Sequence, residues 1–448
     1  MPMTTRLNRF IQRARELVGE QMTALMGLIW EVEGLRESFQ RQDGKKAPGV
    51  DGMRKDDYKD GLDERLMALS GKLRRLAYRP QPVRRCYIEK EDGRKRPLGI
   101  PSFEDRLVQD RVSRVLQAIW EPEFKAFSFG FRPARSAHDA LYWLAQVIRQ
   151  RRTQWVVEAD IRGFFDQLSH AHLLGFLERR IKDPNCLRLI RRFLKAGVME
   201  DGAVQASTAG APQGGLISPV LANIYLHYVL DQWFDEDFKP RCGGQAHLIR
   251  YADDFVGCFE RREDAEAFHC ALAERLAAYD LELAAEKTAI LRFGSEAAKR
   301  CHEDGRKRPR TFQFLGFTHH VAHGRQGGFY VGRRTSAKRA SKKLKAVSLK
   351  LRALRSVGGA AMFAYVAQHL RGHIQYFGVS GNFRPLAGYV YQCAKLLYRW
   401  LIRRSQRRRL TWAQFWAELA PRLPRVRIVH NFFVPPAVWL TRTGSRMV

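Results

Sequence analysis

The sequence predicts an α+β fold, and two observations carry that prediction. Between residues 155 and 293, short apolar runs typical of strands alternate with helical periodicity in the order β-α-α-β-β-α-β. With the additional helix taken as an elaboration, this is the ferredoxin-like order β-α-β-β-α-β. Residues 1–80 and 101–150 carry apolar side chains at helical spacing. We therefore expect an antiparallel sheet in the middle of the chain, preceded by helices.

Three segments interrupt the helices that precede this sheet. A loop is expected at 44–52, where Gly and Pro recur. Residues 84–96 place basic side chains on both sides of a turn at 91–93, which predicts a hairpin that either flanks a triphosphate or template backbone or is simply solvated. The stretch 127–136, FSFGFRPARS, interleaves aromatic rings with arginines. It fits a groove that stacks bases and holds phosphates, and it fits equally a strand whose phenylalanines pack.

Three carboxylates stand where strands are expected to end. A buried strand begins at Trp155 and reaches Asp160, where an acid costs desolvation. Asp253 and Asp254 lie in YADDF between two apolar runs, which predicts a hairpin with both near its tip. An isolated Asp-Asp pair is more often a solvated turn, but the ferredoxin-like order makes the first strand a neighbour of this hairpin. Asp160 then joins the pair across 93 positions, and a two-metal phosphoryl-transfer site explains the three acids better.

A glycine-rich loop separates the two acidic segments. Residues 210–215, GAPQGG, precede a helix that we expect to begin near Ser218 and Pro219, which suit an N-cap and a first helical position. Glycines let a backbone approach a ligand closely, although such a loop alone is weak evidence. Its position between the acidic segments makes it a candidate binding element.

The net charge of +32 indicates a polyanionic partner. Residues 330–448 hold 24 Lys and Arg and a single acid, Glu418, whereas the first 329 residues have a net charge of only +9. Seven cysteines without a C-x-x-C pair predict reduced thiols, and they argue against disulfides and against a zinc site. We expect His319, His320 and His323 to be structural or to face RNA. No apolar run approaches the roughly 20 residues of a membrane span.

Eight motifs, in order along the chain, resemble those of bacterial group II intron-encoded reverse transcriptases and maturases. The segment 370–431 also resembles their thumb or maturase region. The motifs are KKAPGVDG (45–52), RKRPLGIPSFEDRLVQ (94–109), FSFGFRPARSAHDAL (127–141), ADIRGFFD (159–166), APQGGLISPVLANIYL (211–226), YADDF (251–255), LELAAEKT (281–288) and FQFLGF (312–317).

The resemblance implies a right-handed polymerase with fingers, a ferredoxin-like palm, and a basic, mainly helical thumb or maturase domain. The implied boundaries are 1–85 for an N-terminal extension and the start of the fingers, 86–154 for the fingers, 155–330 for the palm with its catalytic hairpin, and 331–448 for the thumb or maturase (X) domain and a C-terminal tail.

The resemblance also implies roles for individual residues. Asp160, Asp253 and Asp254 would be catalytic and would hold two Mg²⁺ ions, or Mn²⁺ in their place, with the backbone carbonyl of Ile161 as a further ligand. Phe165 would exclude a ribose 2′-hydroxyl and so favour deoxynucleotides. The implied dNTP-binding residues are Lys90, Arg96, Phe165, Gln213 and Lys287, and the implied primer and template contacts are Arg132, Arg135, Phe314, Leu315 and Gly316.

The implied function is RNA-directed DNA synthesis by a protein that also binds its own intron RNA, assists its splicing and supports retrohoming into a DNA target. Two alternatives stay open: a domesticated relative in defence, CRISPR adaptation or DNA repair, and an RNA-binding splicing maturase that does not polymerise, which the three acids disfavour. We expect a cytoplasmic, nucleoid-associated ribonucleoprotein without a membrane partner. The lack of paired cysteines beyond the thumb predicts that the endonuclease domain of larger relatives is missing.

Overall fold

The computed structural model describes residues 5–89, 95–150, 152–200, 202–205, 209–210, 214–303, 305–324, 327–403 and 410–433. The chain divides into two compact units. The first comprises Met1–Ala140, Ala159–Gly257 and Glu263–Ala289, and the second comprises Leu141–Glu158, Cys258–Arg262 and Ile290–Val448.

A four-stranded sheet carries the predicted acidic residues. Its strands follow the order β6-β7-β3-β8, so the first strand in the sequence, β3, is hydrogen-bonded to one arm of the central hairpin, as predicted. The helix α12 (Arg262–Ala277) connects the hairpin to the last strand. The ferredoxin-like order of elements is therefore confirmed for this part of the chain. The strands are β3 (Trp155–Asp160), β6 (Ala246–Tyr251), β7 (Asp254–Phe259) and β8 (Ala289–Arg292).

Helices form most of the first unit, as the periodicity predicted. The helix α6 buries Phe103 and Trp120 along its 18 residues, and the Ser102 hydroxyl caps it by accepting a hydrogen bond from the Asp105 amide. No helix covers 44–52, where a loop was expected. The helices that precede the sheet are α1 (Thr5–Glu16), α2 (Met26–Ile29), α3 (Val32–Arg41), α4 (Lys55–Lys59), α5 (Leu62–Arg74), α6 (Phe103–Trp120) and α7 (Ala137–Gln150), the last of which continues into the second unit.

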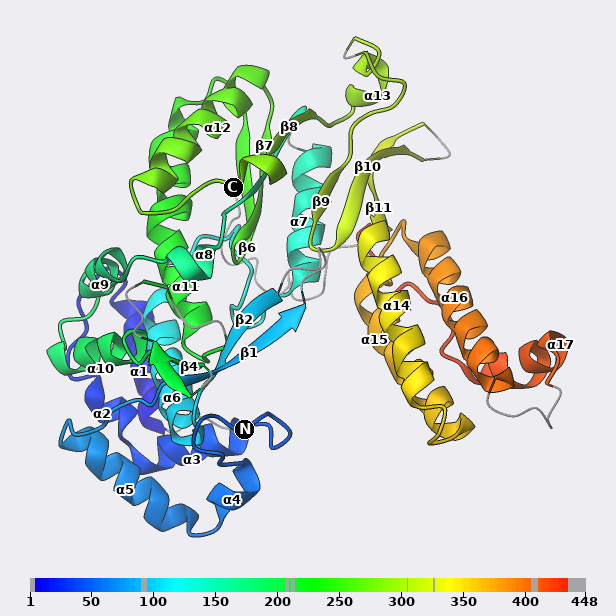
Figure 1. Ribbon diagram of the computed structural model, residues 1–448. Coiled ribbons are helices and arrows are strands. Elements are labelled where there is room, and N and C mark those ends of the chain that lie inside the picture. The colour runs from blue at the N-terminus through cyan, green and yellow to red at the C-terminus, as the bar shows by residue number, and fades with distance from the viewer. Residues whose placement is uncertain are drawn as a thin grey trace. The chain divides into compact units, whose positions relative to one another are not determined.

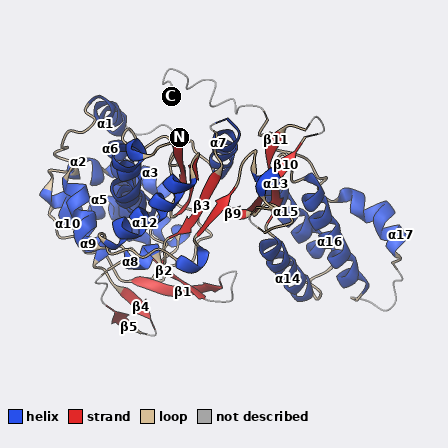
Figure 2. Cartoon of the chain, turned by 90° about the horizontal axis from the view of Figure 1, so that it is seen from above, coloured by secondary structure: helices blue, strands red, loops and turns tan. Residues whose placement is uncertain are grey.

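The basic hairpin is present, and it belongs to a second sheet. Strands β1 (Val83–Glu89) and β2 (Lys95–Ile100) pair antiparallel, while their connecting turn lies outside the described residues. The sheet continues through β4 (Val198–Glu200) and β5 (Ala203–Gln205), which Figure 2 shows in red beside β1. These two strands were not predicted, because three residues are too few to display an alternating pattern.

The helix predicted over 218–236 is also present. It begins as α11 (Ser218–Leu226), with Pro219 in its first turn, and continues with wider turns to Phe238. In Figure 1 it lies among the helices of the first unit, and it packs against α6 and α9. Three helices lie between β3 and β4: α8 (Phe164–Gln167), α9 (His170–Glu178) and α10 (Pro184–Leu194).

The second unit combines a three-stranded sheet with the basic helices. The sheet, of order β11-β10-β9, was not predicted, whereas the helical character of the region after it was. Figure 1 shows α14, α15 and α16 side by side, and α16 packs against both others. The elements are β9 (Phe312–Phe314), β10 (Phe317–His323), β11 (Phe329–Thr335), α13 (Ala297–Arg300), α14 (Ala337–Ala353), α15 (Gly359–Phe377), α16 (Phe383–Ile402) and α17 (Trp412–Gln414).

The structure also describes the cysteines, His319 and the hydropathy of the helices. All seven cysteines are free thiols. His319 is fully buried with its ring stacked 4.7 Å from that of Phe312, and this burial holds its pKa well below the usual range. In the described part of the chain, no helix is long and apolar enough to cross a membrane.

Candidate active site

The acidic hairpin has a two-residue turn. Strand β6 ends at Tyr251 and β7 begins at Asp254, so Ala252 and Asp253 form the connection. Ala252 has a φ of +57°, the left-handed conformation that tight hairpin turns require. Asp253 and Asp254 thus lie at the tip of the hairpin, where the sequence placed them.

Asp160, on a neighbouring strand of the same sheet, and Arg96, on β2 of the other sheet, both lie within electrostatic range of Asp253. Burial, the largest effect, raises the pKa of the Asp253 carboxyl, and the negative charge of Asp160 raises it further. The positive charges of Arg96 and Arg250 act in the opposite direction. Arg96 projects from β2, where its partner across the hairpin is Ile88. Asp160, Asp253 and Arg96, which are remote in sequence, therefore belong to one charged cluster.

Asp160 ends β3 and is held on its backbone and its side chain. Its carbonyl accepts a hydrogen bond of 2.8 Å from the amide of Ala284, and the next residue, Ile161, forms a bridge with Leu283. Its carboxylate forms an ion pair with the ammonium group of Lys287. About half of the Lys287 side chain is exposed to solvent (52%), so this ion pair is accessible from the solvent.

Two glutamates near Lys287 form ion pairs with Arg162, which follows Asp160 in the chain. The guanidinium of Arg162 donates to Glu282 at 2.7 Å and to Glu286 at 3.1 Å. All three side chains are about half exposed, so each pair contributes little to stability by itself. Their effect is to tie the segment after Asp160 to the segment before Lys287.

The donor set suits a hard divalent cation. Carboxylate oxygens are the ligands that Mg²⁺ prefers, and Mg²⁺ usually binds through one or two carboxylates together with substrate phosphates and water. Among the described residues, no group of three or more His, Cys, Asp or Glu side chains is arranged to hold a metal. The pair of Asp160 and Asp253 fits such an ion that a substrate helps to bind, and it does not form a complete cage of protein ligands.

Phe165 lies on the short helix that follows β3. It is partly buried, and its ring contacts that of Phe164 edge-on at 5.3 Å. The glycine-rich loop begins directly against its backbone: a Cβ built on Gly210 would lie 2.9 Å from the Phe165 carbonyl oxygen, and Gly210 has a φ of +85°. Only glycine satisfies both conditions, so the loop sequence explains how 210 can approach Phe165.

Two of the predicted nucleotide-binding residues lie outside the described residues. These are Lys90, in the turn of the basic hairpin, and Gln213, in the glycine-rich loop. Arg96 and Lys287 belong to the charged cluster, as described above. The predicted contacts of all these residues with a nucleotide stay predictions.

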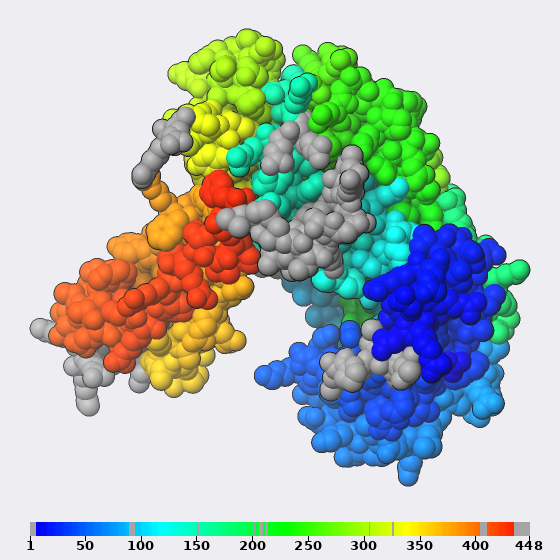
Figure 3. Space-filling view, turned by 180° about the vertical axis from the view of Figure 1, so that it is seen from behind, coloured from blue at the N-terminus to red at the C-terminus, as the bar shows by residue number. Residues whose placement is uncertain are grey.

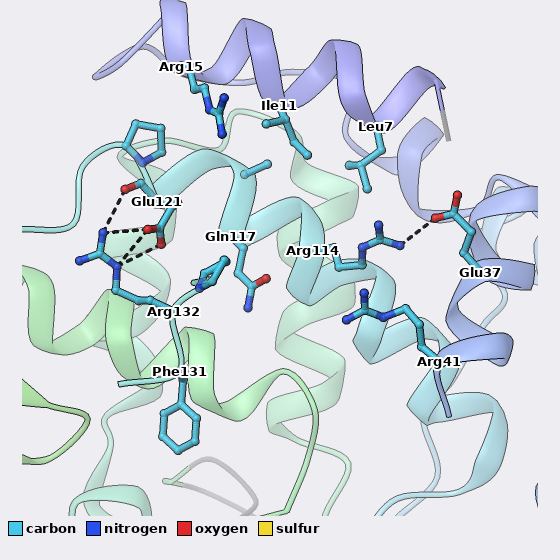
Figure 4. A pocket seen from close by; sticks show the side chains of 13 residues that line it. Leu7, Ile11, Arg15, Glu37, Arg41, Arg114, Gln117, Glu121, Phe131 and Arg132 are labelled. Atoms are coloured by element: carbon cyan, nitrogen blue, oxygen red, sulfur yellow. Dashed lines mark hydrogen bonds and ion pairs between the residues drawn. The ribbon is translucent and has the colours of Figure 1, made fainter. Parts of the chain in front are cut away.

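Arg132 and Arg135 make contacts within the protein. The Arg132 side chain is 2% exposed, and its guanidinium forms an ion pair with Glu121 at 2.9 Å, which Figure 4 shows among the residues that line a cavity of about 750 Å³. It also donates to the carbonyls of Lys125 and Ser128. Arg135 donates to the carbonyl of Ala126 and lies over the ring of Phe129. The predicted template contacts of both arginines are not tested by these observations.

The aromatic stretch around these arginines is a loop with one isolated bridge, between Ser128 and Arg250, and not the expected strand, but two of its rings pack. Phe129 is buried, and its amide donates to the Arg250 carbonyl at 2.9 Å. Phe127 contacts the ring of Phe234, whereas Phe131 remains 49% exposed. The packing interpretation therefore holds for the first two rings.

The predicted primer strip is a tight turn in the second unit. Leu315 and Gly316 connect β9 to β10 with positive φ angles. The Tyr376 hydroxyl donates to the Leu315 carbonyl at 2.9 Å, and Phe314 is buried. The structure gives this turn a fixed shape, while its contact with a primer stays a prediction.

The second unit also contains a basic groove. It has a volume of about 620 Å³ and lies between α15 and the extended segment 424–427, in the part of the chain coloured orange and red in Figure 3. Arg371, Arg425 and Arg427 line it and are exposed. Within the described part of the chain, none of the three has an acidic partner.

Sequence reasoning missed a buried polar cluster behind the acidic turn. Its centre is Arg250, which is fully buried and bonded to Asp231, Asn223 and Ser128. The available signal was a charged residue inside the otherwise apolar run before YADDF, and an acid inside the apolar helix that precedes it.

Sequence comparison finds relatives of this chain among known proteins. Residues 88–319 match the family model for reverse transcriptase (RNA-dependent DNA polymerase). The group II intron-encoded protein LtrA of Lactococcus lactis subsp. cremoris is 40% identical over 228 residues, which are 50% of this chain but only 38% of LtrA. Protein YkfC of Escherichia coli K12 is 38% identical over 263 residues, 52% of this chain and 69% of YkfC. A 91 kDa protein in the cob intron of Schizosaccharomyces pombe is 39% identical over 188 residues, 42% of this chain and 21% of that protein.

Proposed function

Because the chain belongs to the reverse transcriptase family, we propose that it is an RNA-directed DNA polymerase with its active site at Asp160, Asp253 and Asp254. One observation carries this assignment. The strand order makes β3 a neighbour of the hairpin, and the charge of Asp160 acts directly on the Asp253 carboxyl. Because the negative charge of Asp160 raises the pKa of the Asp253 carboxyl, a cation bound between the two acids would stabilise them, and nucleotidyl transfer by this family generally requires divalent metal ions.

The proposed polymerase has the right-handed arrangement that the motifs imply. Its fingers would be residues 86–154, its palm 155–330, and its thumb or maturase domain 331–448. The confirmed β-α-β-β-α-β order in the middle of the chain supports the palm, and the helices α14–α16 support a helical thumb.

Asp160, Asp253 and Asp254, with the carbonyl of Ile161, would hold two Mg²⁺ ions. When bound, these ions would activate the primer 3′-hydroxyl and stabilise the charge that develops on the α-phosphate and on the leaving pyrophosphate. Lys287 would then leave the Asp160 carboxylate, because the metal replaces it as the neutralising cation. Its ammonium group would be free to give a proton to the pyrophosphate.

The side chains around the acids would select and hold the incoming nucleotide. Arg96, whose charge already reaches Asp253, would bind the triphosphate together with Lys90 and Gln213. Phe165 would fill the space that a ribose 2′-hydroxyl needs, and its packing against Phe164 would keep the ring in place. Deoxynucleotides would be preferred by steric exclusion.

The RNA partner that we propose is the group II intron that encodes the chain, whose splicing and mobility it would assist. The concentration of positive charge after residue 330 supports a polyanionic partner, since each phosphate contact adds salt-sensitive affinity. The groove formed by Arg371, Arg425 and Arg427 supplies three exposed cations for it. Sequencing the RNA that co-purifies with the protein tests the proposal: a structured intron supports it, and a short noncoding RNA or mixed cellular RNA contradicts it.

The double substitution Asp253→Ala, Asp254→Ala tests whether polymerisation and RNA binding are separate properties of the chain. We expect the variant to lose DNA synthesis and to bind the co-purifying RNA with wild-type affinity, because the positive charge that binds RNA lies elsewhere in the sequence. Primer extension and filter binding measure the two properties. Synthesis that survives the double substitution would refute the assignment of the active site.

A further inference from the structure

We propose that Arg250 is a positioning residue that sets the geometry of the catalytic turn from behind. The inference rests on the proposed polymerase function, and it concerns a residue that touches neither substrate nor metal. Arg250 lies in β6, two residues before the turn, and it is fully buried. A charged side chain in such a place costs several kcal/mol unless every one of its polar atoms is paired.

All five N–H groups of the Arg250 guanidinium have acceptors. Nε donates to one oxygen of Asp231 at 2.6 Å, and one terminal nitrogen donates to the other oxygen of Asp231 and to the Ser128 hydroxyl at 2.8 Å. The second terminal nitrogen donates to Asn223 at 3.1 Å and to the backbone carbonyl of Ala252 at 3.0 Å. The last of these bonds connects the network directly to the turn.

The acceptors come from three separate segments and are buried as well. Asp231 and Ser128 are 0% exposed and Asn223 is 2% exposed. Asp231 neutralises the arginine, and the fork geometry of a guanidinium lets a single side chain bridge all the segments. A lysine provides three donors from one nitrogen and cannot reproduce this pattern.

The same network holds the loop that contains Ser128 and Gly130 in contact with the turn. The Asn223 amide donates to the carbonyl of Gly130 at 2.7 Å. A Cβ built on Gly130 would lie 2.3 Å from the Ala252 nitrogen and 2.9 Å from the Tyr251 carbonyl carbon, so only glycine permits this contact. Phe129 and Phe127 add two backbone hydrogen bonds to Arg250, each of 2.9 Å.

These contacts explain why the turn can hold an unfavourable conformation. Ala252 adopts φ +57°, which costs an L-residue about 1–2 kcal/mol, and such strain persists only where the surroundings fix it. The residue after it, Asp253, must present its carboxylate next to Asp160. A displacement of about 1 Å at such a position is enough to lower a catalytic rate by about 100-fold. Arg250 therefore determines how well the two acids can share a metal ion.

Two variants disturb the turn by independent routes. Arg250→Lys keeps the positive charge opposite Asp231 and removes the planar guanidinium with its five donors. Gly130→Ala leaves the ion pair intact and forces a methyl group against Ala252. Gly175→Ala is the matched control, because no atom lies within 4 Å of a Cβ at that helical position. Thermal unfolding midpoints establish which variants are folded.

Two measurements distinguish positioning from simple structural support. The first is primer extension as a function of Mg²⁺ concentration at saturating dNTP. The second, which does not depend on activity, is equilibrium binding of Mn²⁺ to the protein by electron paramagnetic resonance. For both variants we expect kcat to fall about 10- to 100-fold, the half-saturating Mg²⁺ concentration to rise, and Mn²⁺ affinity to fall, with the KM for dNTP little changed and Gly175→Ala like wild type.

A structural role without positioning gives a different result. Synthesis would then fall by one factor at every Mg²⁺ concentration, in proportion to the folded fraction, and Mn²⁺ affinity per folded molecule would equal that of wild type. That result would overturn the proposal. If wild-type protein makes no DNA, the proposed function fails, and the Mn²⁺ measurement still decides whether Arg250 and Gly130 shape a metal site.

Discussion

The turn that carries Asp253, which we propose to be catalytic, and the basic region after residue 330 use positive charge in opposite ways. Behind the turn, Arg250 is completely buried and all its donors are used inside the protein. In the basic region, Arg371, Arg425 and Arg427 are exposed around a groove and have no acidic partner among the described residues. The first arrangement fixes geometry, and the second leaves charge available for a polyanion.

The difference predicts different responses to salt and to substitution. A buried, fully bonded charge is weakly screened, and its loss disturbs the structure around it. Exposed cations bind phosphates by releasing counterions, so their contribution falls as salt rises and is distributed over many contacts. Substitutions at the turn should change rates, whereas substitutions in the groove should change affinities.

The largest expected effect is that of Asp160→Asn. The variant should lose at least about 10³-fold in DNA synthesis, which corresponds to about 4 kcal/mol of transition-state stabilisation, because one carboxylate of the proposed metal site becomes neutral. Its affinity for RNA should be unchanged. Glu274→Gln, an exposed acid on α12, is the control and should keep full activity. Equal losses in both variants would contradict a special role for Asp160.

The next effect concerns sugar selection. Phe165→Val should reduce the preference for dNTPs over rNTPs by about 10- to 100-fold, since the smaller side chain leaves room for a 2′-hydroxyl. The kcat/KM values for matched dNTP and rNTP pairs measure it. Phe164→Leu controls for the packing of Phe165, and it should change the preference much less. A preference that is unaltered in Phe165→Val would remove the steric argument.

Substitutions in the basic groove should have an intermediate effect, and they should change only the affinity for RNA. Replacing Arg371, Arg425 and Arg427 by Gln should lower RNA affinity about 10-fold near 150 mM salt and reduce the slope of log K against log salt by about 2. The rate on a saturating primer–template should stay the same. The control removes the same charge at three exposed residues, Lys350 and Arg352 at the end of α14 and Arg355 in the turn that follows it. If the control loses as much affinity, the groove has no specific role.

The smallest expected effect is a pH dependence of stability, which comes from His227 beside the Arg250 network. Burial lowers the pKa of His227 to about 4, although Asp231 acts in the opposite direction. The folded state therefore binds this proton less readily than the unfolded state, and stability is lost as pH falls from about 6.5 towards 4. Between pH 7 and pH 5, His227 should lower the free energy of unfolding by about 2 kcal/mol.

Urea unfolding at pH 7 and pH 5 measures this contribution. In His227→Phe the loss of stability between the two pH values should be smaller than in wild type by about that amount. An identical loss in both proteins would show that His227 is protonated in the folded state, and it would contradict the burial argument.

Much of the site followed from local patterns, and its supporting structure did not. Short apolar runs located the hairpin and the strand that ends at Asp160, and the order of elements made them neighbours. The partners of Arg250 could not be predicted, because Ser128 lies in a loop, Asn223 and Asp231 lie on the helix 218–238, and only tertiary packing joins them to the strand of Arg250. The sheet of β9–β11 was missed because β9 has only three residues and because the histidines of β10 and the arginines of β11 interrupt the alternation of apolar residues.

The central claim is tested most directly by primer extension with the purified chain. The reaction contains a heteropolymeric RNA template, a DNA primer, dNTPs and Mg²⁺, with parallel reactions that contain EDTA or rNTPs. The account predicts extension to the end of the template with dNTPs, its abolition by EDTA, and little extension with rNTPs. A folded protein that fails to extend the primer, or that extends it equally well in EDTA, would contradict a metal-dependent reverse transcriptase centred on Asp160, Asp253 and Asp254.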